Sequence, residues 1–143
     1  MITKFPTELL AENGITLTPL RKDILTIFLS AKNPLSAYEV LAKLKKKRPN
    51  AEPPTAYRVI DFFMQKKLLH RIETENKYVF CSHLDHIKSQ YHGILFLCEQ
   101  CHSWHEYLDD ELLKFIKHFS EKNKLLVKES VIEMKGICKN CIM

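Results

Sequence analysis

Hydrophobic residues in the first 67 positions recur three or four residues apart, the spacing of amphipathic helices. Helix start and stop signals divide this region into four predicted helices. The first covers residues 7–13 and is ended by Gly14, and the second is capped by Thr18 with Pro19 in its first turn. The third is opened by the capping box Ser36-Ala37-Tyr38-Glu39, and the fourth runs from Pro53-Pro54-Thr55 to about Lys67. The apolar stripe of the last segment is formed by Tyr57, Ile60, Phe63 and Met64. The first part of the chain is therefore predicted to be helical.

From Leu68 onwards the hydrophobic period changes to two, which is typical of β-strands. Residues 69–73 and 77–81 are predicted to form a hairpin that turns near Glu75-Asn76. Helices followed by a two-stranded wing indicate a winged helix-turn-helix domain over residues 1–81. The alternative is a small helical domain with a merely stabilising hairpin, which leaves the basic charge of this region unexplained.

The rest of the chain predicts a hinge and a small second domain. Residues 82–92 are polar and contain histidines, so they are interpreted as a linker. Residues 93–143 predict strands at 94–98, 103–107 and 127–137, and a helix capped by Asp109 or Asp110 that ends near Asn123. The fold class is α+β, with a winged helix followed by a small α/β dimerisation domain. A unit of about 50 residues rarely has a sufficient core alone, so a metal and a partner surface are expected.

Charge and composition narrow the function. Residues 1–80 carry 14 Lys/Arg and 8 Asp/Glu, whereas residues 81–143 carry 8 and 9. A basic domain joined to a neutral one is typical of proteins that bind nucleic acid. No apolar stretch approaches the roughly 20 residues that cross a bilayer, and the N-terminus lacks the apolar core of a signal peptide. A cytoplasmic protein without a membrane partner is expected.

The cysteines indicate metal binding. The chain has five of them: Cys81, Cys98, Cys101, Cys138 and Cys141. The last four form two Cys-x-x-Cys knuckles separated by 36 residues, and two such knuckles complete the tetrahedron of a structural zinc site. Independent redox pairs and a rubredoxin-like iron site are the alternatives. Neither pair has a thioredoxin-type helix start beside it, which favours zinc.

The fifth cysteine suggests a second metal site. In a hairpin centred on residues 75 and 76, His70 stands opposite Cys81, and cross-strand neighbours on one face lie close enough to share a metal ion. Further ligands are available from the linker and the second domain: His83, His86, His92, and Glu106 or His105. The alternative is a buried Cys81 with a surface His70 that binds no metal.

Together these motifs resemble the ferric uptake regulator family, and within it the zinc-responsive members. The resemblance spans nearly the whole chain and is carried by Leu17-Thr18-Pro19-Leu20-Arg21, Ser36-Ala37-Tyr38-Glu39, Pro53-Pro54-Thr55-Ala56-Tyr57-Arg58, the hairpin end Tyr78-Val79-Phe80-Cys81, and both cysteine knuckles. Leu20 stands where the family usually has glutamine, and His102 stands where glycine normally follows the first knuckle. The linker also differs in length from the zinc-responsive pattern, which leaves His92, His86 and His83 as alternative histidine ligands.

The resemblance implies a zinc-responsive repressor that binds palindromic double-stranded operator DNA as a metal-loaded homodimer and represses uptake genes. It implies a structural zinc on Cys98, Cys101, Cys138 and Cys141, and a sensory zinc on His70, Cys81, His92 and Glu106, which makes about two zinc ions per chain. DNA contacts are expected from Thr55, Tyr57, Arg58 and Arg21. The chain lacks phosphate-binding loops, nucleophile elbows and His-Glu-x-x-His patterns, so no enzyme activity and no small-molecule substrate are expected. An iron- or peroxide-responsive regulator, and a zinc-stapled redox or adaptor protein without DNA binding, are the alternatives.

Overall fold

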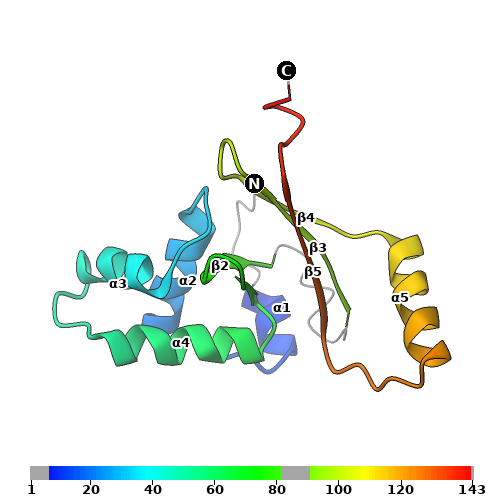
Figure 1. Cartoon of the computed structure of the whole chain (residues 1–143). Helices are drawn as coiled ribbons and strands as arrows, with labels where there is room; N and C mark the ends of the chain where they lie inside the picture. Colours follow the sequence, from blue (N-terminus) through cyan, green and yellow to red (C-terminus); the bar gives the residue numbers. More distant parts are fainter. Residues whose placement is uncertain (1–6, 82–90, 143) are drawn as a thin grey trace. The chain divides into compact units, whose positions relative to one another are not determined.

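The computed structural model describes residues 7–81 and 91–142, and the chain divides into two compact units, residues 1–87 and residues 88–143 (Figure 1). The described part of the N-terminal unit contains α1 (Thr7–Glu12), α2 (Pro19–Ser30), α3 (Ala37–Lys45), α4 (Pro53–Gln65), β1 (Leu69–Ile72) and β2 (Lys77–Phe80). The described part of the C-terminal unit contains β3 (Tyr91–Cys98), β4 (Trp104–Tyr107), α5 (Asp110–Lys122) and β5 (Ser130–Gly136). The mixed α+β fold, with a winged helix-turn-helix arrangement, agrees with the predicted class.

The helix ends of the N-terminal unit follow the predicted signals. The Thr18 side chain accepts a hydrogen bond from the backbone N–H of Arg21 at 3.3 Å and caps α2. The Ser36 side chain caps α3 in the same way, accepting from the N–H of Glu39 at 3.1 Å. Such caps replace the hydrogen bonds that the first turn of a helix lacks. The capping predictions for both helices are confirmed.

The core of the N-terminal unit is formed by one face of each helix and one face of the hairpin. Helix α4 contributes Ala56, Val59, Ile60 and Phe63, which recur at three and four residues. Tyr57, which was predicted to belong to this stripe, is half exposed instead. It lies one residue after Ala56 and therefore about 100° around the helix from the buried face.

The hairpin register differs from the predicted one. His70 pairs with Val79 rather than with Cys81, because the strands are joined by a four-residue loop whose last residue, Asn76, has a left-handed backbone (φ 52°). The pairing is displaced by two residues, and a displacement of two keeps each side chain on its predicted face. His70 and Cys81 are therefore diagonal rather than direct neighbours.

The C-terminal unit is a three-stranded sheet with strand order β4-β3-β5. Strand β3 pairs antiparallel with β4 and parallel with β5, and α5 lies in the connection that makes the parallel pairing possible. The Asp109 side chain caps α5 by accepting from the N–H of Leu112 at 2.9 Å. Strand β3 begins at Tyr91, so the last two residues of the predicted linker belong to a strand, and residues 82–90 lie outside the described part.

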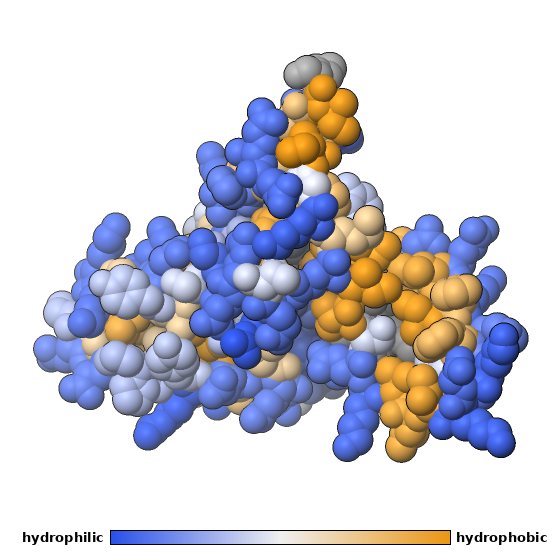
Figure 2. All heavy atoms as spheres, viewed as in Figure 1, coloured by the Kyte–Doolittle hydropathy of each residue, from blue (hydrophilic) through white to orange (hydrophobic). Residues whose placement is uncertain are grey.

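Apolar side chains are exposed on the C-terminal unit. On helix α5, Phe115 is 65% exposed and Phe119 is 51% exposed, and Leu126 in the following loop is 88% exposed. Figure 2 shows these hydrophobic colours gathered over α5 and the neighbouring sheet, whereas the visible face of the N-terminal helices is mostly hydrophilic. In the described residues no helix has the length and apolarity of a membrane span.

Candidate metal centre

The strand order brings the two cysteine knuckles together. Cys98 is the last residue of β3 and pairs with Gly136, the last residue of β5. Because the two strands are parallel, their carboxyl ends meet at the same edge of the sheet, and each knuckle begins there. The N–H of Glu99 also donates to the carbonyl of Gly136 at 2.8 Å, which holds the start of the first knuckle against the end of β5.

The four sulfur atoms fit a tetrahedral zinc ion. The Sγ atoms of Cys98, Cys101, Cys138 and Cys141 all lie within 4.8 Å of one another. Zinc–sulfur bonds of about 2.3 Å in a tetrahedron place sulfur atoms about 3.8 Å apart. The Cys101 and Cys138 sulfurs are 3.8 Å apart, so the residues fit the metal that the sequence predicted.

Hydrogen bonds make the first knuckle a good source of thiolate. The N–H groups of Cys101 and Cys138 approach the Cys98 sulfur at 3.5 and 3.3 Å, and they lower the pKa of this thiol to about 6. A hydrogen bond with the Ser103 side chain lowers the pKa of Cys101. The neighbouring Cys138 side chain, by contrast, raises the pKa of Cys141 to about 12. These contacts favour the thiolate form of Cys98 and Cys101, which is the form of cysteine that binds a metal dication.

His102 closes the first knuckle in an unusual backbone conformation. Its φ is 59°, and its N–H donates to the carbonyl of Cys98 at 2.9 Å. Glycine adopts this left-handed region readily, whereas a residue with a Cβ atom is strained there. The departure from the glycine expected at this position therefore carries a conformational cost, at a residue that is not itself one of the predicted zinc ligands.

His70 and Cys81 lie together on the wing. Both are buried, with exposed fractions of 3% and 2%, and their ligand atoms lie within 4.8 Å of each other. The other face of the hairpin packs into the helical core through Leu69 and Phe80, so these two residues face away from that core. A buried imidazole beside a buried thiol is a suitable half of a zinc site.

The other predicted sensory ligands belong to the C-terminal unit or to undescribed residues. Glu106 lies on β4, half-buried and paired with Leu95 of β3. His92 lies in β3, and its side chain is outside the described part, as are His83 and His86. The complete four-residue site therefore stays a prediction.

The predicted DNA-contacting residues of α4 lie on its outer surface. Tyr57 and Arg58 are exposed and Thr55 is half-buried, whereas the residues between and after them face the core. The helix begins with Pro53 and Pro54, which lack N–H groups and fit the first turn. The exposed side chains are consequently presented near the start of the helix.

Arg21, the remaining predicted DNA contact, is engaged within the N-terminal unit. Its guanidinium carbon lies 3.6 Å from the centre of the Phe62 ring, and its terminal nitrogen donates to the carbonyl of Thr16 at 2.9 Å. Stacking of this kind is a cation–π interaction. Arg21 therefore links the start of α2 to α4, a role that the sequence pattern did not indicate.

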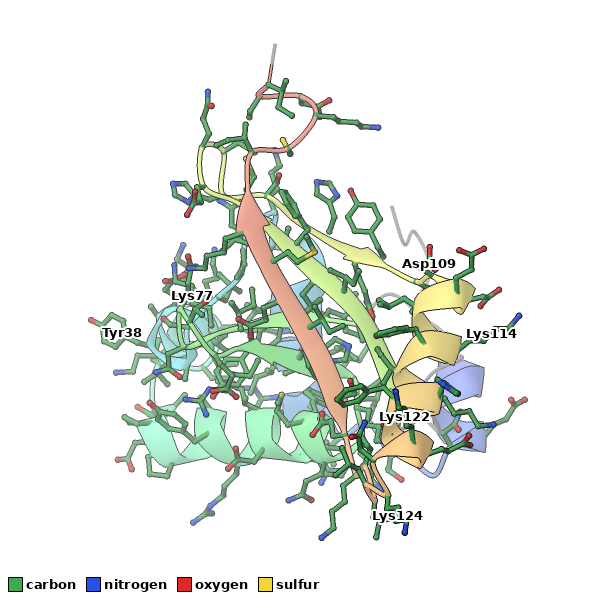
Figure 3. All side chains as sticks on the ribbon, turned by 45° about the vertical axis from the view of Figure 1, so that its right-hand side comes forward. Tyr38, Lys77, Asp109, Lys114, Lys122 and Lys124 are labelled. Atoms are coloured by element: carbon green, nitrogen blue, oxygen red, sulfur yellow. The ribbon has the colours of Figure 1, made fainter. Side chains whose placement is uncertain are left out.

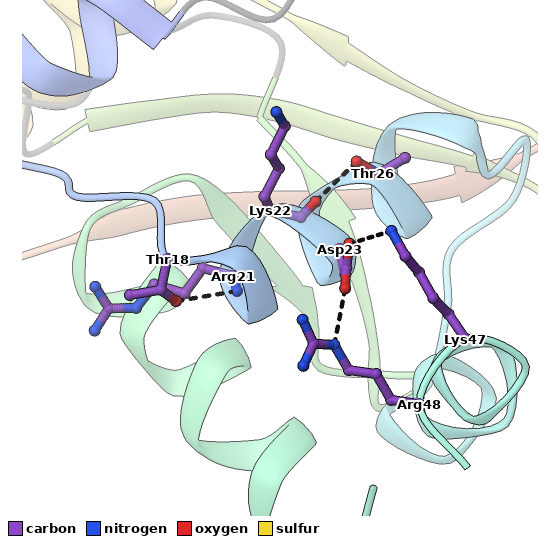
Figure 4. A network of polar contacts seen from close by, with 7 residues as sticks. All are labelled: Thr18, Arg21, Lys22, Asp23, Thr26, Lys47 and Arg48. Atoms are coloured by element: carbon purple, nitrogen blue, oxygen red, sulfur yellow. Dashed lines mark hydrogen bonds and ion pairs between the residues drawn. The ribbon is translucent and has the colours of Figure 1, made fainter.

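Sequence reasoning also missed other surface residues of the N-terminal unit. Tyr38 is 79% exposed and extends outward from α3 (Figure 3). In the sequence, the available signal was its place outside the apolar spacing of Val40, Leu41 and Leu44. Asp23, on α2, forms hydrogen-bonded ion pairs of 2.8 Å with Lys47 and with Arg48 (Figure 4). Lys47 lies 24 positions away along the chain, so no local pattern could reveal these pairs.

Comparison with known proteins agrees with this geometry. Residues 12–135 match the ferric uptake regulator family. The zinc uptake regulation protein of Escherichia coli (strain K12) is 29% identical over 132 residues, covering 92% of this chain and 76% of that protein. The ferric uptake regulation protein of Staphylococcus epidermidis is 26% identical over 144 residues, covering 99% of this chain and 97% of that protein.

Among solved structures, a zinc uptake regulator complexed with zinc and DNA superimposes with a TM-score of 0.85. Its sequence is 28% identical, and the match covers 95% of this chain and 89% of that one. The family match extends over most of the chain and includes the predicted recognition helix, the wing and the first cysteine knuckle. This protein belongs to the ferric uptake regulator family, whose members are transcription regulators and not enzymes.

Proposed function

We propose that this protein is a cytoplasmic, zinc-responsive transcriptional repressor that binds palindromic operator DNA as a zinc-loaded homodimer and represses metal-uptake genes. The observation that carries the proposal is the buried pair of His70 and Cys81 on the wing. This pair belongs to the same unit as α4, so a metal ion held there acts next to the proposed DNA-reading helix. The structural cluster of four cysteines is separate and lies in the C-terminal unit.

The ligand type favours zinc over iron. Thiolate is a soft ligand that suits zinc, whereas iron-sensing sites depend more on nitrogen and oxygen ligands. Cys81 supplies the thiolate and His70 the imidazole. Glu106 and His92 are proposed to complete the site, on the resemblance to zinc-responsive members of the family. The similarity to zinc uptake regulators supports this choice, and the similarity to a ferric uptake regulation protein makes iron the alternative to test.

The N-terminal unit has the charge and the surface that duplex DNA requires. The excess of Lys/Arg over Asp/Glu in residues 1–80 favours contact with phosphates. On α4, exposed Arg58 is suited to the hydrogen-bond acceptors of guanine in the major groove, and exposed Tyr57 to backbone or thymine contact. The similar zinc uptake regulator, whose structure contains DNA, supports this assignment.

A second copy of the chain is the proposed partner of the C-terminal unit. Phe115 and Phe119 on α5, Leu126 in the loop and Met134 on β5 expose apolar surface that a monomer of this size rarely leaves in water. Strand β5 is also an edge strand. A symmetric dimer would cover the apolar side chains and would present two α4 helices to the two halves of a palindrome.

Zinc is proposed to act by population shift. An ion that binds ligands from both the wing and the C-terminal unit favours the arrangement of units in which both recognition helices of a dimer meet successive major grooves. Without the sensory ion that arrangement is rare, so the affinity for the operator falls. The structural ion has no part in this switch beyond keeping the C-terminal unit folded.

Metal analysis combined with DNA binding tests the proposal. The probe is a duplex selected from a random library by the zinc-loaded wild-type protein. After mild chelation, we expect the protein to keep one zinc ion per chain and not to bind DNA. After zinc is restored, we expect two zinc ions per chain and DNA binding. Restoration by ferrous iron but not by zinc would favour an iron- or peroxide-responsive regulator. Failure to select any duplex would favour an adaptor without DNA contact.

A further inference from the structure

A basic pocket lies between α2 and the turn that follows α3. The pocket has a volume of about 480 Å³ and is lined by Leu17, Pro19, Lys22, Asp23, Thr26, Lys47 and Arg48. Three of its residues are cationic and one is a carboxylate, so its net charge is positive. Two of the cations, Lys47 and Arg48, are the end of the basic run Lys45-Lys46-Lys47-Arg48. The proposed function assigns no role to this feature.

Asp23 fixes the positions of both cations. One carboxylate oxygen accepts from Lys47 Nζ and the other from Arg48 Nε, each at 2.8 Å. The Asp23 side chain is 13% exposed, whereas the side chains of Lys47 and Arg48 are 74% and 40% exposed. The carboxylate is thus held against the protein while the cations reach solvent. Figure 4 shows the dashed line to Asp23 ending on Nε, with the two terminal nitrogens of Arg48 lying beyond that contact.

Stability alone explains this arrangement poorly. The Lys47 and Arg48 side chains are 74% and 40% exposed, so water screens their ion pairs with Asp23, and ordering two long side chains costs entropy, which limits what these pairs contribute to folding. Fixing the side chains in advance has a different consequence. An incoming anion finds the guanidinium and the ammonium already ordered, so less entropy is lost when it binds. The pocket is therefore better suited to binding than to holding α2 and α3 together.

The position of the pocket in the chain indicates which anion it meets. Arg48 precedes Pro53, the first residue of α4, by only five residues, and the carbonyl of Arg48 accepts from the N–H of Ala51 within the connecting turn. The start of α4 presents Tyr57 and Arg58 outward. The turn leads into this same end of α4, so a duplex whose bases met these side chains would bring its sugar–phosphate backbone near the turn. A DNA phosphate is consequently the anion most accessible to the pocket.

We propose that the basic pocket binds a DNA backbone phosphate through Lys47 and Arg48, with Asp23 as the positioning residue. The inference rests on the proposed DNA binding and adds a contact outside the bases that α4 reads. Arg48 donates through its terminal nitrogens while Nε remains on Asp23, and Lys47 supplies the second positive charge. Because phosphate contacts carry no base information, the pocket strengthens binding to every sequence alike.

The salt dependence of DNA binding tests the contact. The zinc-loaded full-length protein is titrated with a selected duplex and with a mixed-sequence duplex at several salt concentrations. Each phosphate neutralised contributes about 0.9 to the slope of log K against log salt. The double variant Lys47→Gln/Arg48→Gln should lower the slope by about one per subunit, or about two per dimer. The affinity ratio between the two duplexes should stay unchanged.

A matched pair of charge removals controls for net charge. Lys122→Gln/Lys124→Gln removes two exposed charges from the C-terminal unit and should leave the slope unaltered. An unchanged slope in the pocket variant, or an equal fall in both pairs, overturns the inference. If the double pocket variant does not fold, Lys47→Gln alone is measured, and its slope must still fall. Wild-type protein that binds neither duplex at any zinc concentration would instead overturn the proposed function itself.

Replacing Asp23 by asparagine separates the effect of net charge from the effect of positioning, because the two predict opposite changes in DNA affinity. Asp23→Asn makes the protein more positive, so charge alone predicts tighter DNA binding. Loss of positioning predicts weaker binding by about twofold to tenfold, since one long side chain must then be ordered during association. Asp23→Glu should recover part of the loss. Tighter binding by Asp23→Asn would refute the positioning role.

Discussion

Replacing Cys98 by serine should unfold the C-terminal unit while the N-terminal unit stays folded. Cys98 is fully buried and its sulfur accepts two backbone hydrogen bonds as well as facing the other thiols. A structural zinc site contributes about 10–16 kcal/mol of apparent folding energy. A core in a unit this small supplies no more than about 3–5 kcal/mol. Losing even half of the zinc contribution, about 5–8 kcal/mol, would exceed what the core alone provides.

Trp104 makes the outcome directly measurable. It is the only tryptophan of the chain and lies on β4, paired with Leu97 of β3, so its fluorescence reports on the C-terminal unit. Cys98→Ser should shift Trp104 emission toward that of the denatured protein, lower the zinc content by one per chain and dissociate the dimer. Cys81→Ser is the control, because it also removes a buried thiol but should leave emission and dimer intact. Unaltered emission and full zinc content in Cys98→Ser would refute a structural role for the cluster.

Three further changes have defined outcomes. Arg58→Ala should reduce discrimination between the selected duplex and mixed-sequence DNA by about 1–3 kcal/mol without changing zinc content, and an unaltered affinity ratio would exclude Arg58 as a base reader. Gly93→Ala should lower the stability of the C-terminal unit by about 1–3 kcal/mol, because the added Cβ meets the carbonyl of Tyr107, and an unchanged Trp104 unfolding midpoint would contradict this. His102→Gly should leave the Trp104 unfolding midpoint unchanged or raise it, whereas His102→Val should lower it, because valine tolerates a positive φ poorly. Equal midpoints for the two variants would argue against strain at this turn.

Local signals were sufficient for much of the fold. Helix caps depend on a side chain and an N–H three residues later, so the sequence identified Thr18 and Ser36 directly and narrowed the cap of α5 to Asp109 or Asp110, of which the structure shows Asp109. The two cysteine knuckles could be predicted equally directly, because their spacing alone places both sulfurs of each pair on one side of a turn. Bringing the pairs together required only that β3 and β5 be parallel.

Features that depend on exact geometry were harder to predict. The hairpin register was displaced by two because the loop between the strands spans four residues, 73–76, and loop length is not fixed by strand periodicity. Tyr57 was predicted to lie on the buried face of α4, but it is half exposed. Its aromatic ring is compatible with a core or a surface position, so residue type alone did not decide between them. The stacking of Arg21 on Phe62 could not be predicted either, because it requires α2 and α4 to be packed first; the expected contact of Arg21 with DNA stays a prediction. The ion pairs of Asp23 could not be predicted for the same reason, because Lys47 and Arg48 lie 24 and 25 positions away along the chain and meet Asp23 only in the folded unit.

The most direct test of zinc sensing is the operator affinity of Cys81→Ser against free zinc, at one fixed salt concentration. Salt must be fixed because phosphate contacts make DNA affinity strongly dependent on it. If zinc at His70 and Cys81 is the switch, the variant remains a folded dimer with its structural zinc, loses the second zinc and no longer responds to zinc in DNA binding. A variant that keeps two zinc ions per chain and zinc-dependent binding would contradict the proposed sensory site, and Cys81 would then be only a buried residue of the wing.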